Sequence, residues 1–456
     1  MKVTVVGCGY VGLVTGVGLA SLGHDVVGVE VDGERRERIA AGSPPFHEPG
    51  LADLLGRVLN SGRFRVSATL SDARDSDVVL LAVQTPPRPD GASDLRFLIT
   101  AAEALVEQFA NDARRRVVAT RSTVVPGTTD SVVAPILRAQ MEIAVASNPE
   151  FLREGSAVED FLRPDRVVVG CHDVWALEVM AELYSPLNGP FIGTTPTTAE
   201  LAKYTSNAFL ATLISFSNEI ARICESLPGV DVEDVLGILH QDRRLRPQVN
   251  GQVATPGILA YLKSGCGYGG SCLPKDLSSF IAQRHAAGER APLLEAVRSI
   301  NDTQPERIVA MASRALDGLA GRTVAVLGAA FKAGTDDLRD SPGLKTVEAL
   351  LTQGASVVIF DPLVAPELLS HLTGRGVRVA ASLADAVRRA DACLVTTNDP
   401  AFLELETLTA SASVPPVVVD GRRILAPERF AHSIYHAIGR GEALQDDVSA
   451  RGIADT

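Results

Sequence analysis

The first thirty residues constrain the fold more than any other stretch of the chain. Residues 2–6 are a short β-branched run, an apolar pattern at helical spacing leads to Leu22, and residues 26–30 read as a second strand. Glycines that permit a tight turn and a close approach of the backbone to a ligand occupy the join between the first strand and the helix. That join reads Gly7-Cys8-Gly9-Tyr10-Val11-Gly12.

This strand–turn–helix unit predicts a dinucleotide site. The turn would let a pyrophosphate reach the N-terminus of the helix, where free N–H groups and the dipole favour an anion. Glu30 comes 18 positions after Gly12, the spacing of an acid that holds a ribose 2′-hydroxyl, so we expect NAD rather than NADP. Arg35 lies close by and could soften the exclusion of a 2′-phosphate. The alternative is an ordinary tight strand–helix turn.

Apolar strand-like runs alternate with helical stretches in two separate parts of the chain, which indicates an α/β protein with two Rossmann-like, doubly wound domains. We expect an NAD-binding Rossmann domain at 1–195 and a Rossmann-like domain at 306–440. The second lacks a full Gly-x-Gly-x-x-Gly and is not expected to bind a second dinucleotide. The runs are 3–6, 26–31, 78–83, 116–120, 143–146 and 166–169, then 323–327, 356–360, 392–396 and 416–419.

A long central helix is expected to join these domains. Residues 197–226 carry apolar side chains at helical spacing without Pro or Gly, which gives a helix of about 45 Å at 1.5 Å per residue. So long a helix can bridge two domains and leave apolar surface for a second subunit, although it could instead be covered within the chain. It opens a small helical domain at 196–305, and 441–456 read as a polar tail.

Composition narrows the class of protein. A chain of 456 residues suggests two or three domains, and a net charge of −12 argues against a nucleic-acid partner. The first strand is expected at Lys2 and no stretch could span a membrane, so we expect a cytoplasmic protein. The cysteines lack the paired spacing of a metal site and are expected to be reduced thiols. They are Cys8, Cys171, Cys224, Cys266, Cys272 and Cys393.

One of these cysteines lies in an unusual setting. Cys272 follows several glycines and precedes Lys275 and Asp276. A thiol is a good nucleophile only as the thiolate, which a neighbouring cation favours. The alternative is an inert cysteine packed under a glycine-rich loop. Together with a nicotinamide domain, an activated Cys272 suggests oxidation through a covalent thiol intermediate.

Several sequence blocks occur in the order found in one family. They are Gly7–Gly12, Thr85-Pro86, 122–128, 148–155, 199–209, 269–276 and 331–339. On these blocks, residues 1–435 resemble the UDP-glucose/GDP-mannose dehydrogenase family, and within it the UDP-glucose 6-dehydrogenases most closely. The resemblance implies a homodimer and a four-electron oxidation that turns the C6 alcohol of UDP-glucose into a carboxylate while two NAD⁺ are reduced. Cys272 would hold the intermediate as a thiohemiacetal and then as a thioester.

Spacing and the resemblance together suggest roles for residues. Lys203 and Asn207 are four residues apart and so share one face of the long helix, where an ammonium and an amide can stabilise oxyanions; the alternative is a solvated lysine and a surface asparagine. Asp276 is a candidate base or water-orienting group for the chemistry of Cys272. Glu150 and Thr123 would position the catalytic water, although Glu150 could instead be a carboxylate at a helix start. Contacts to the cofactor would come from the first glycine turn and from Glu30, Arg35, Thr85, Thr123, Glu154, Lys275 and Arg339. Contacts to the nucleotide sugar would come from Glu150, Phe151, Leu152, Arg153, Lys203, Asn207, Tyr261, Leu262, Gly265, Gly269, Lys332 and Arg422.

Three departures from the family pattern keep alternatives open. Gln84 replaces a glycine beside Thr85, and Glu30 replaces a commoner Asp. Residues 256–258 stand where the family has Arg-Ile-Gly, so an expected sugar-contacting Arg is missing, and the basic cluster 243–246 could compensate. The alternatives are a dehydrogenase of GDP-mannose or another nucleotide sugar, a two-electron hydroxyacid dehydrogenase, and an NAD-binding protein without enzymatic activity. The last two would not require Cys272.

Overall fold

The structure is a computed structural model that describes residues 1–110, 112, 114–138, 143–249 and 252–441. It divides into two compact units, and each is described by itself. The first contains 1–208 and 275–291, and the second contains 209–274 and 292–456. Among the described residues, no helix combines the length and apolarity that crossing a bilayer requires. Residues 442–456 of the expected polar tail lie outside the described residues.

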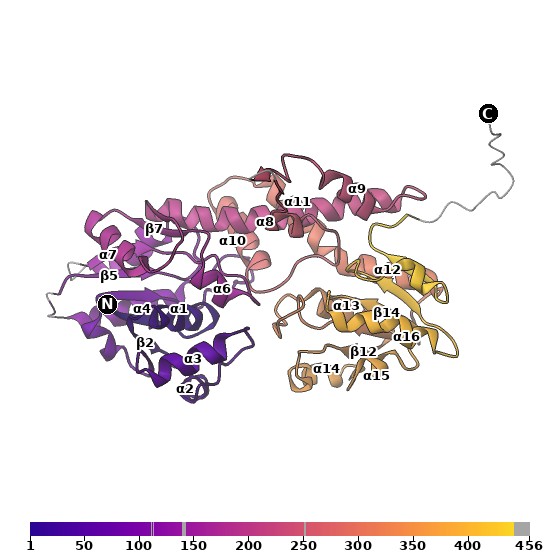
Figure 1. The fold of residues 1–456 in the computed structure, drawn as a ribbon, viewed down its shortest axis with the longest axis horizontal. Helices are drawn as coiled ribbons and strands as arrows, with labels where there is room; N and C mark the ends of the chain where they lie inside the picture. The colour runs from indigo at the N-terminus through magenta and orange to yellow at the C-terminus, as the bar shows by residue number, and fades with distance from the viewer. Residues whose placement is uncertain (111, 113, 139–142, 250–251, 442–456) are drawn as a thin grey trace. The chain divides into compact units, whose positions relative to one another are not determined.

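The first unit is built on an eight-stranded sheet of order β3-β2-β1-β4-β5-β6-β7-β8 (Figure 1). Every neighbouring pair is parallel except β6 and β7. The order reverses direction between β1 and β4, so the carboxyl ends of these strands meet at a topological switch point, where α/β sheets bind ligands. The strands are β1 (Lys2–Val6), β2 (Asp25–Val29), β3 (Phe64–Ser67), β4 (Val78–Leu81), β5 (Arg116–Thr120), β6 (Ile143–Ser147), β7 (Val167–Cys171) and β8 (Phe191–Thr194).

Helices cover both faces of this sheet because alternate strand residues point to opposite sides. Val3, Val5 and Leu80 belong to one apolar cluster with α1, α3, α6 and α7, whereas Val79 and Leu81 belong to another with α4 and α5. This arrangement is doubly wound, as expected. The helices are α1 (Tyr10–Ser21), α2 (Gly33–Ala40), α3 (Leu51–Asn60), α4 (Arg96–Phe109), α5 (Ala134–Arg138), α6 (Ala157–Leu162) and α7 (Val174–Tyr184).

The second unit holds a six-stranded parallel sheet of order β13-β12-β11-β14-β15-β16. Two apolar clusters again lie on its opposite faces. Its strands are β11 (Thr323–Leu327), β12 (Ser356–Phe360), β13 (Val377–Val379), β14 (Ala392–Val395), β15 (Val417–Asp420) and β16 (Tyr435–Ala437). Its helices are α11 (Pro292–Asp302), α12 (Gln304–Ala315), α13 (Pro342–Thr352), α14 (Ser370–Thr373), α15 (Leu383–Val387) and α16 (Leu405–Ala410).

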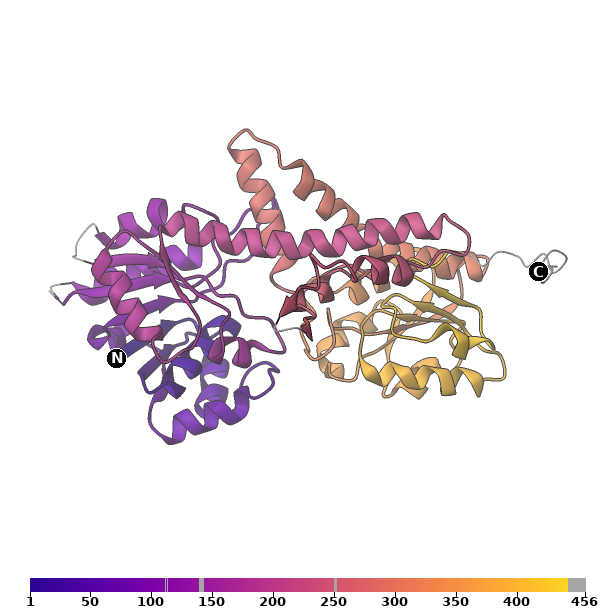
Figure 2. The same cartoon turned by 45° about the horizontal axis from the view of Figure 1, so that its top comes forward.

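The long helix predicted at 197–226 is α8 (Pro196–Glu225), which Figure 2 shows as one unbroken helix. Its first residues belong to the first unit and its remainder to the second. α10 (Leu273–Ala286) likewise starts in the second unit and continues in the first. The second unit also contains α9 (Val232–Leu239) and a short hairpin of β9 (Gln248–Val249) and β10 (Gln252–Val253).

The two sheets share a backbone motif after their first strands. The Gly7 amide donates to the Val29 carbonyl at 2.8 Å, and the Gly328 amide donates to the Phe360 carbonyl at 2.8 Å. The residue after β12 is Asp361, whose carboxylate accepts the amides of Ala329 and Ala330 at 2.8 and 3.0 Å. In both turns, therefore, an acid after the second strand accepts backbone amides of the turn that follows the first strand.

Candidate active site

The glycine turn after β1 has the geometry that a dinucleotide requires. Gly7 has a φ of +91°, which favours glycine, and a Cβ on Gly12 would lie 1.8 Å from the Gly7 carbonyl oxygen. A Cβ on Gly9 would meet nothing within 4 Å, so space remains beside the N-terminus of α1. These residues fit a bound pyrophosphate. At Gly12 the helix packs directly on the turn, and at Gly9 there is room for the ligand.

Glu30 follows β2, and its carboxylate is almost fully buried. It accepts the Cys8 amide at 3.2 Å and lies 3.3 Å from the Arg35 guanidinium, which is 42% exposed. Glu30 is therefore held at the glycine turn, where a ribose would reach it. Arg35 stands beside it, as the sequence suggested.

Thr85 and Thr123 come together at the carboxyl edge of the sheet. Thr85 follows β4 and Thr123 follows β5, and the Thr85 hydroxyl donates to the Thr123 carbonyl at 2.9 Å. The pair flanks the switch point beside β1, so both residues are placed where a cofactor would bind.

Lys203 on α8 and Glu150 form a buried ion pair with 3.0 Å between Nζ and Oε1, and both side chains are less than 5% exposed. Burial raises the pKa of Glu150, but the Lys203 ammonium, the Leu152 amide and the Arg121 guanidinium outweigh it and lower that pKa. Glu150 is thus held as a carboxylate. It lies well before the start of α6 at Ala157, so it is not a carboxylate at a helix start.

Asn207 lies one turn further along α8 and reaches a second acid. Its amide nitrogen donates to Asp276 Oδ2 at 2.6 Å, and the Lys275 ammonium donates to Asp276 Oδ1 at 2.5 Å. Asp276 is buried in the first turn of α10. The expected same-face placement of Lys203 and Asn207 is confirmed, and each is paired with a carboxylate.

Cys272 directly precedes α10, so only three residues separate it in the chain from Asp276. Its sulfur lies 3.5 Å from the Ser271 hydroxyl. Of the six cysteines it is the partly exposed one, and the other five are buried. Burial raises the pKa of the Cys8, Cys266 and Cys393 thiols to about 12, 11 and 12. Exposure therefore singles out Cys272 as the accessible thiol.

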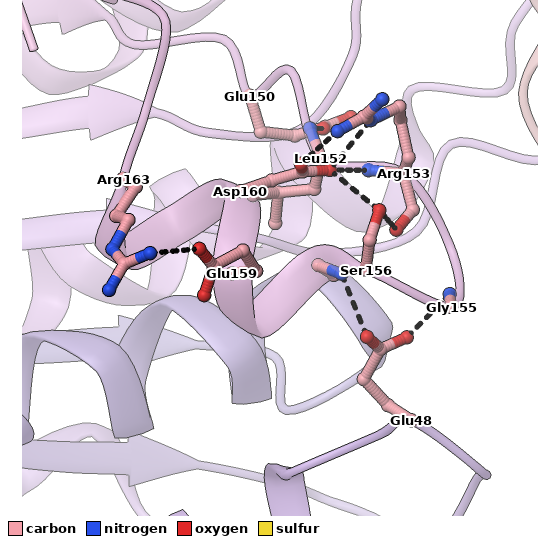
Figure 3. Close-up of polar contacts among 10 residues, drawn as sticks. Glu48, Glu150, Leu152, Arg153, Gly155, Ser156, Glu159, Asp160 and Arg163 are labelled. Atoms are coloured by element: carbon pink, nitrogen blue, oxygen red, sulfur yellow. Dashed lines mark hydrogen bonds and ion pairs between the residues drawn. The ribbon is translucent and has the colours of Figure 1, made fainter.

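The segment 150–156 is tied down by carboxylates (Figure 3). Glu150 accepts the Leu152 amide at 2.6 Å, and Asp160 accepts the Arg153 amide at 2.9 Å and its guanidinium at 2.5 Å. The Arg166 guanidinium carbon lies over the Phe151 ring, 4.0 Å from the ring centroid. The Leu152 and Arg153 amides are already engaged, so this segment would meet a ligand with its side chains and carbonyls.

In the second unit, Arg422 joins three loops. Its guanidinium donates to the carbonyls of Thr396, Gly267 and Phe331 at 2.7, 3.2 and 3.3 Å. Lys332 follows Phe331 and lies with its ammonium 5.5 Å from that ring. We expected Arg422 to supply charge to a nucleotide, and the structure gives it the further task of bracing this loop cluster.

The remaining expected residues of this unit lie in the braced loops or beside them. Tyr261 ends a short 3₁₀ helix (Gly257–Tyr261), and Leu262 is buried, with its carbonyl 3.0 Å from His240. The Gly265 amide donates to Asn218 at 2.8 Å. A Cβ on Gly269 would lie 2.4 Å from the Asp340 carbonyl, and the next amide, of Gly270, donates to the Arg339 carbonyl at 2.9 Å. Arg339 itself forms a two-pronged pair with Asp337.

The basic cluster that could replace the missing Arg is held by local partners. Arg244 pairs with Asp242, and Arg246 donates to Gln241 and Thr255 at 3.1 and 3.2 Å. Among the described residues, no group of three or more His, Cys, Asp or Glu side chains is arranged to hold a metal ion.

Sequence reasoning missed several residues that shape the first unit. Arg121 is buried at the end of β5 and donates to the carbonyls of Asn148 and Pro149 at 3.1 and 3.2 Å, which fixes the approach to Glu150. Its signal was a charged residue directly after an apolar strand. Glu200 on α8 accepts the amides of Gly127 and Thr129, and although it lies in the block 199–209 we assigned it no role from the sequence.

Comparison with known proteins matches three successive parts of the chain to one family. Models of the UDP-glucose/GDP-mannose dehydrogenase family match its NAD-binding domain at 1–188, its central domain at 197–303 and its UDP-binding domain at 325–427. A UDP-glucose 6-dehydrogenase of Haloferax volcanii is 40% identical over 93% of this chain and 97% of its own. One of Pseudomonas aeruginosa is 38% identical over 97% and 98%.

A solved structure of a UDP-glucose dehydrogenase from Pyrobaculum islandicum superposes with a TM-score of 0.87 at 37% identity and covers 96% of this chain and 98% of its own. The two Rossmann-like folds, the glycine turn with Glu30 and the agreement over nearly the full length lead to one assignment. This chain is an NAD-dependent oxidoreductase that belongs to the UDP-glucose/GDP-mannose dehydrogenase family.

Proposed function

We propose that this protein oxidises the C6 alcohol of UDP-glucose to the carboxylate of UDP-glucuronate and that Cys272 carries the intermediate. The observation that supports the chemistry best is the double pairing on α8, where Lys203 meets Glu150 and Asn207 meets Asp276. It places a buried ammonium and an amide one turn apart, each with a proton acceptor. Such a set can stabilise oxygen anions and move protons at one carbon.

The residues of the chain divide the reaction into steps. The glycine turn and Glu30 would hold NAD⁺, which would supply the hydride acceptor, and the two oxidations would each use one NAD⁺, bound in turn. A carboxylate takes the proton of the C6 hydroxyl in the first step. Cys272 then adds to the aldehyde carbon to give a thiohemiacetal, which prevents the aldehyde from escaping. The second oxidation leaves a thioester, and water positioned by Glu150 and Thr123 hydrolyses it to the carboxylate and the free thiol.

UDP-glucose is proposed as the substrate because the relatives at 40% and 38% identity are named UDP-glucose 6-dehydrogenases and cover nearly the whole chain. The nucleotide would be held by the second unit, where Arg422 braces loops that carry Lys332, Gly265 and Gly269. The segment 151–153 would contact the sugar. Oxidation of GDP-mannose remains the alternative, and it is not favoured by these relatives.

Counting NADH tests this proposal directly. With limiting UDP-glucose we expect two NADH per nucleotide sugar, and a panel with GDP-mannose and UDP-N-acetylmannosamine should give much slower reduction. One NADH together with a released aldehyde would contradict the covalent mechanism. Faster reduction with GDP-mannose would instead contradict the substrate.

The variant Cys272→Ser tests the role of the thiol. It should permit the first oxidation and stall afterwards, because an oxygen ester is harder to hydrolyse than a thioester. Mass spectrometry should then find a covalent adduct or accumulated aldehyde. Cys224→Ser, which changes a buried thiol on α8, should retain two NADH per substrate. Complete four-electron turnover by Cys272→Ser at the wild-type rate would show that Cys272 is only a packing residue.

The assembly is also a proposal. Phe209, Phe216 and Ile223 are spaced by seven residues on α8, so they share one face of the helix, and they are 53%, 46% and 50% exposed. An apolar stripe of this kind is typical of a helix that pairs with a second copy. We therefore propose a homodimer through α8 and retain the division into domains at 1–195, 196–305 and 306–440 as part of the proposal.

A further inference from the structure

Glu48 is a buried carboxylate outside every set of site residues named so far. It lies in the loop before α3 and is 6% exposed. It accepts the Gly155 amide on Oε2 and the Ala157 amide on Oε1, each at 2.7 Å, and Oε2 also accepts the Tyr10 hydroxyl. Figure 3 shows the side chain reaching the backbone at Gly155. A buried carboxylate needs such donors, because an unpaired one is costly.

The Tyr10 end of this cluster belongs to the glycine turn. Tyr10 is the first residue of α1 and lies between Gly9 and Gly12. Its ring packs on Phe46 with 4.8 Å between centroids, two residues before Glu48. Burial, the bond to Glu48 and the nearby Glu154 charge all raise the pKa of Tyr10, so its hydroxyl stays a donor at neutral pH. Any shift of α1 on cofactor binding would therefore act on Glu48.

The other end of the cluster is the segment proposed to contact the sugar. Gly155 has a φ of +82° and follows 150–154 directly, and Ala157 begins α6. The same segment is fastened at Arg153 by Asp160 and at Leu152 by Glu150. Glu48 therefore joins the far end of this segment to the glycine turn through one side chain. All of these residues belong to the first compact unit.

We propose that Glu48 is a positioning residue that couples cofactor binding at the glycine turn to nucleotide-sugar binding at 150–156. This coupling rests on the proposed function only for the identity of the two ligands. The Tyr10 hydroxyl donates to Glu48, and Glu48 holds the backbone of Gly155 and Ala157, so a cofactor placed against the start of α1 would act on the segment 150–156 through these bonds. Thermodynamic linkage makes the effect reciprocal.

Binding measurements without turnover test the coupling. NADH and UDP-glucose form a pair that cannot react, so calorimetry can give the Kd of UDP-glucose without and with saturating NADH. We expect NADH to tighten UDP-glucose binding by about fivefold or more in the wild-type protein. Tyr10→Phe removes only the hydroxyl and leaves Glu48 on both amides, so the ratio should fall to about one while the fold is kept.

Two further variants complete the cycle. Glu48→Gln places an amide N–H against one of the donors and should also bring the ratio to about one. The double variant Tyr10→Phe/Glu48→Gln should show the same ratio of UDP-glucose Kd values as either single variant, because both changes break the same hydrogen-bonded connection. Glu159→Gln is the matched control on α6, since its 61% exposed side chain pairs with Arg163 and lies outside the Glu48 cluster, and it should keep the wild-type ratio.

The outcomes separate the two proposals. A wild-type ratio retained in Tyr10→Phe would overturn the coupling. A wild-type protein that binds both ligands with a ratio of one would also overturn it, and the proposed function would stand. Failure of UDP-glucose to bind at all would overturn both.

Discussion

The buried pair of Lys203 and Glu150 is the residue-scale feature with the largest energetic consequence. The pair is nearly inaccessible to solvent, so removal of one partner leaves a buried, uncompensated charge. Glu150 has a pKa below its ordinary value, so it contributes stability that is present above its unfolded pKa of 4.5 and is lost as pH falls through the folded value. The pair thus links the stability of the fold to the chemistry proposed for the same two side chains.

Lys203→Ala should destabilise the protein by about 3–5 kcal/mol at pH 7. Without the ammonium, burial opposes the ionisation of Glu150 with less compensation, so we expect the pKa of Glu150 to rise relative to the wild-type protein and the loss of stability to be smaller at pH 5 than at pH 7. Denaturant unfolding at pH 7 and pH 5 checks this. Lys203→Ala/Glu150→Gln should recover part of the loss, and Lys263→Ala, at an exposed lysine, should change little.

The same substitution tests catalysis. If Lys203 stabilises an oxygen anion, Lys203→Ala should lower kcat by about 10²–10³. The Kd of UDP-glucose should change much less, because the proposed nucleotide contacts lie elsewhere. A loss confined to affinity would argue against an anion-stabilising role.

Glu30 and Arg35 are the residues that we expect to set the cofactor preference. Glu30 should repel a 2′-phosphate, so kcat/KM should favour NAD⁺ over NADP⁺ by at least about tenfold, or about 1.4 kcal/mol. In the wild-type protein the Arg35 guanidinium lies 3.3 Å from the Glu30 carboxylate. Glu30→Ala removes this partner, so Arg35 could bind a 2′-phosphate and the relative use of NADP⁺ should rise. Glu30→Ala/Arg35→Ala is the control and should lose that gain. Equal use of both cofactors by the wild-type protein would mean that Arg35 dominates.

Among the elements, α1 depends most strictly on its sequence. It packs so closely on the end of β1 that a Cβ on Gly12 would lie 1.8 Å from the Gly7 carbonyl oxygen. The clash is with backbone, so no side-chain rotation can relieve it. The second sheet repeats this feature, since a Cβ on Gly343 would lie 2.1 Å from the Gly328 carbonyl oxygen. The same strand–helix packing was therefore built twice in one chain.

Gly12→Ala and Gly56→Ala form a matched pair that tests this element. Gly12→Ala should destabilise the first unit and abolish NADH binding, because α1 must move away from the turn. A Cβ on Gly56 of α3 meets nothing within 4 Å, so Gly56→Ala should stabilise by about 0.4–1 kcal/mol by restricting the unfolded chain. Thermal unfolding with and without NADH checks both. Normal NADH binding by Gly12→Ala would contradict the proposed cofactor site.

At the scale of the whole molecule, the exposed apolar stripe on α8 is the surface proposed to form the dimer. Phe216→Glu places a charge among apolar side chains and should convert the proposed dimer to a monomer in light scattering after gel filtration. Val414→Glu changes an apolar side chain that is 79% exposed away from α8, and it should leave the mass unchanged. A wild-type protein that is already monomeric would contradict the proposal.

The strands predicted from the sequence are the central strands of the two larger sheets. The strands that it missed are β3, β8, β13 and β16 at the edges of these sheets, and β9 and β10 of the short hairpin. Central parallel strands are buried on both faces and read as continuous apolar runs. Edge strands are half exposed and contain residues such as Arg65, Ile192 and Arg378, so they lack that signal. The antiparallel pairing of β6 with β7 also could not be predicted from the sequence, because tertiary contacts determine the direction in which two strands pair.

The sequence by itself determined the fold class, the glycine turn with Glu30, the long helix and the choice of Cys272 as the candidate nucleophile. Each of these depends on local spacing or on a specific residue type. Only the tertiary structure decided which charges meet. Lys203 finds Glu150 53 residues away, Asn207 finds Asp276 69 residues away, and Glu48 finds Gly155 107 residues away. Such pairs leave no periodic signal, because burial and the order of the strands bring them together.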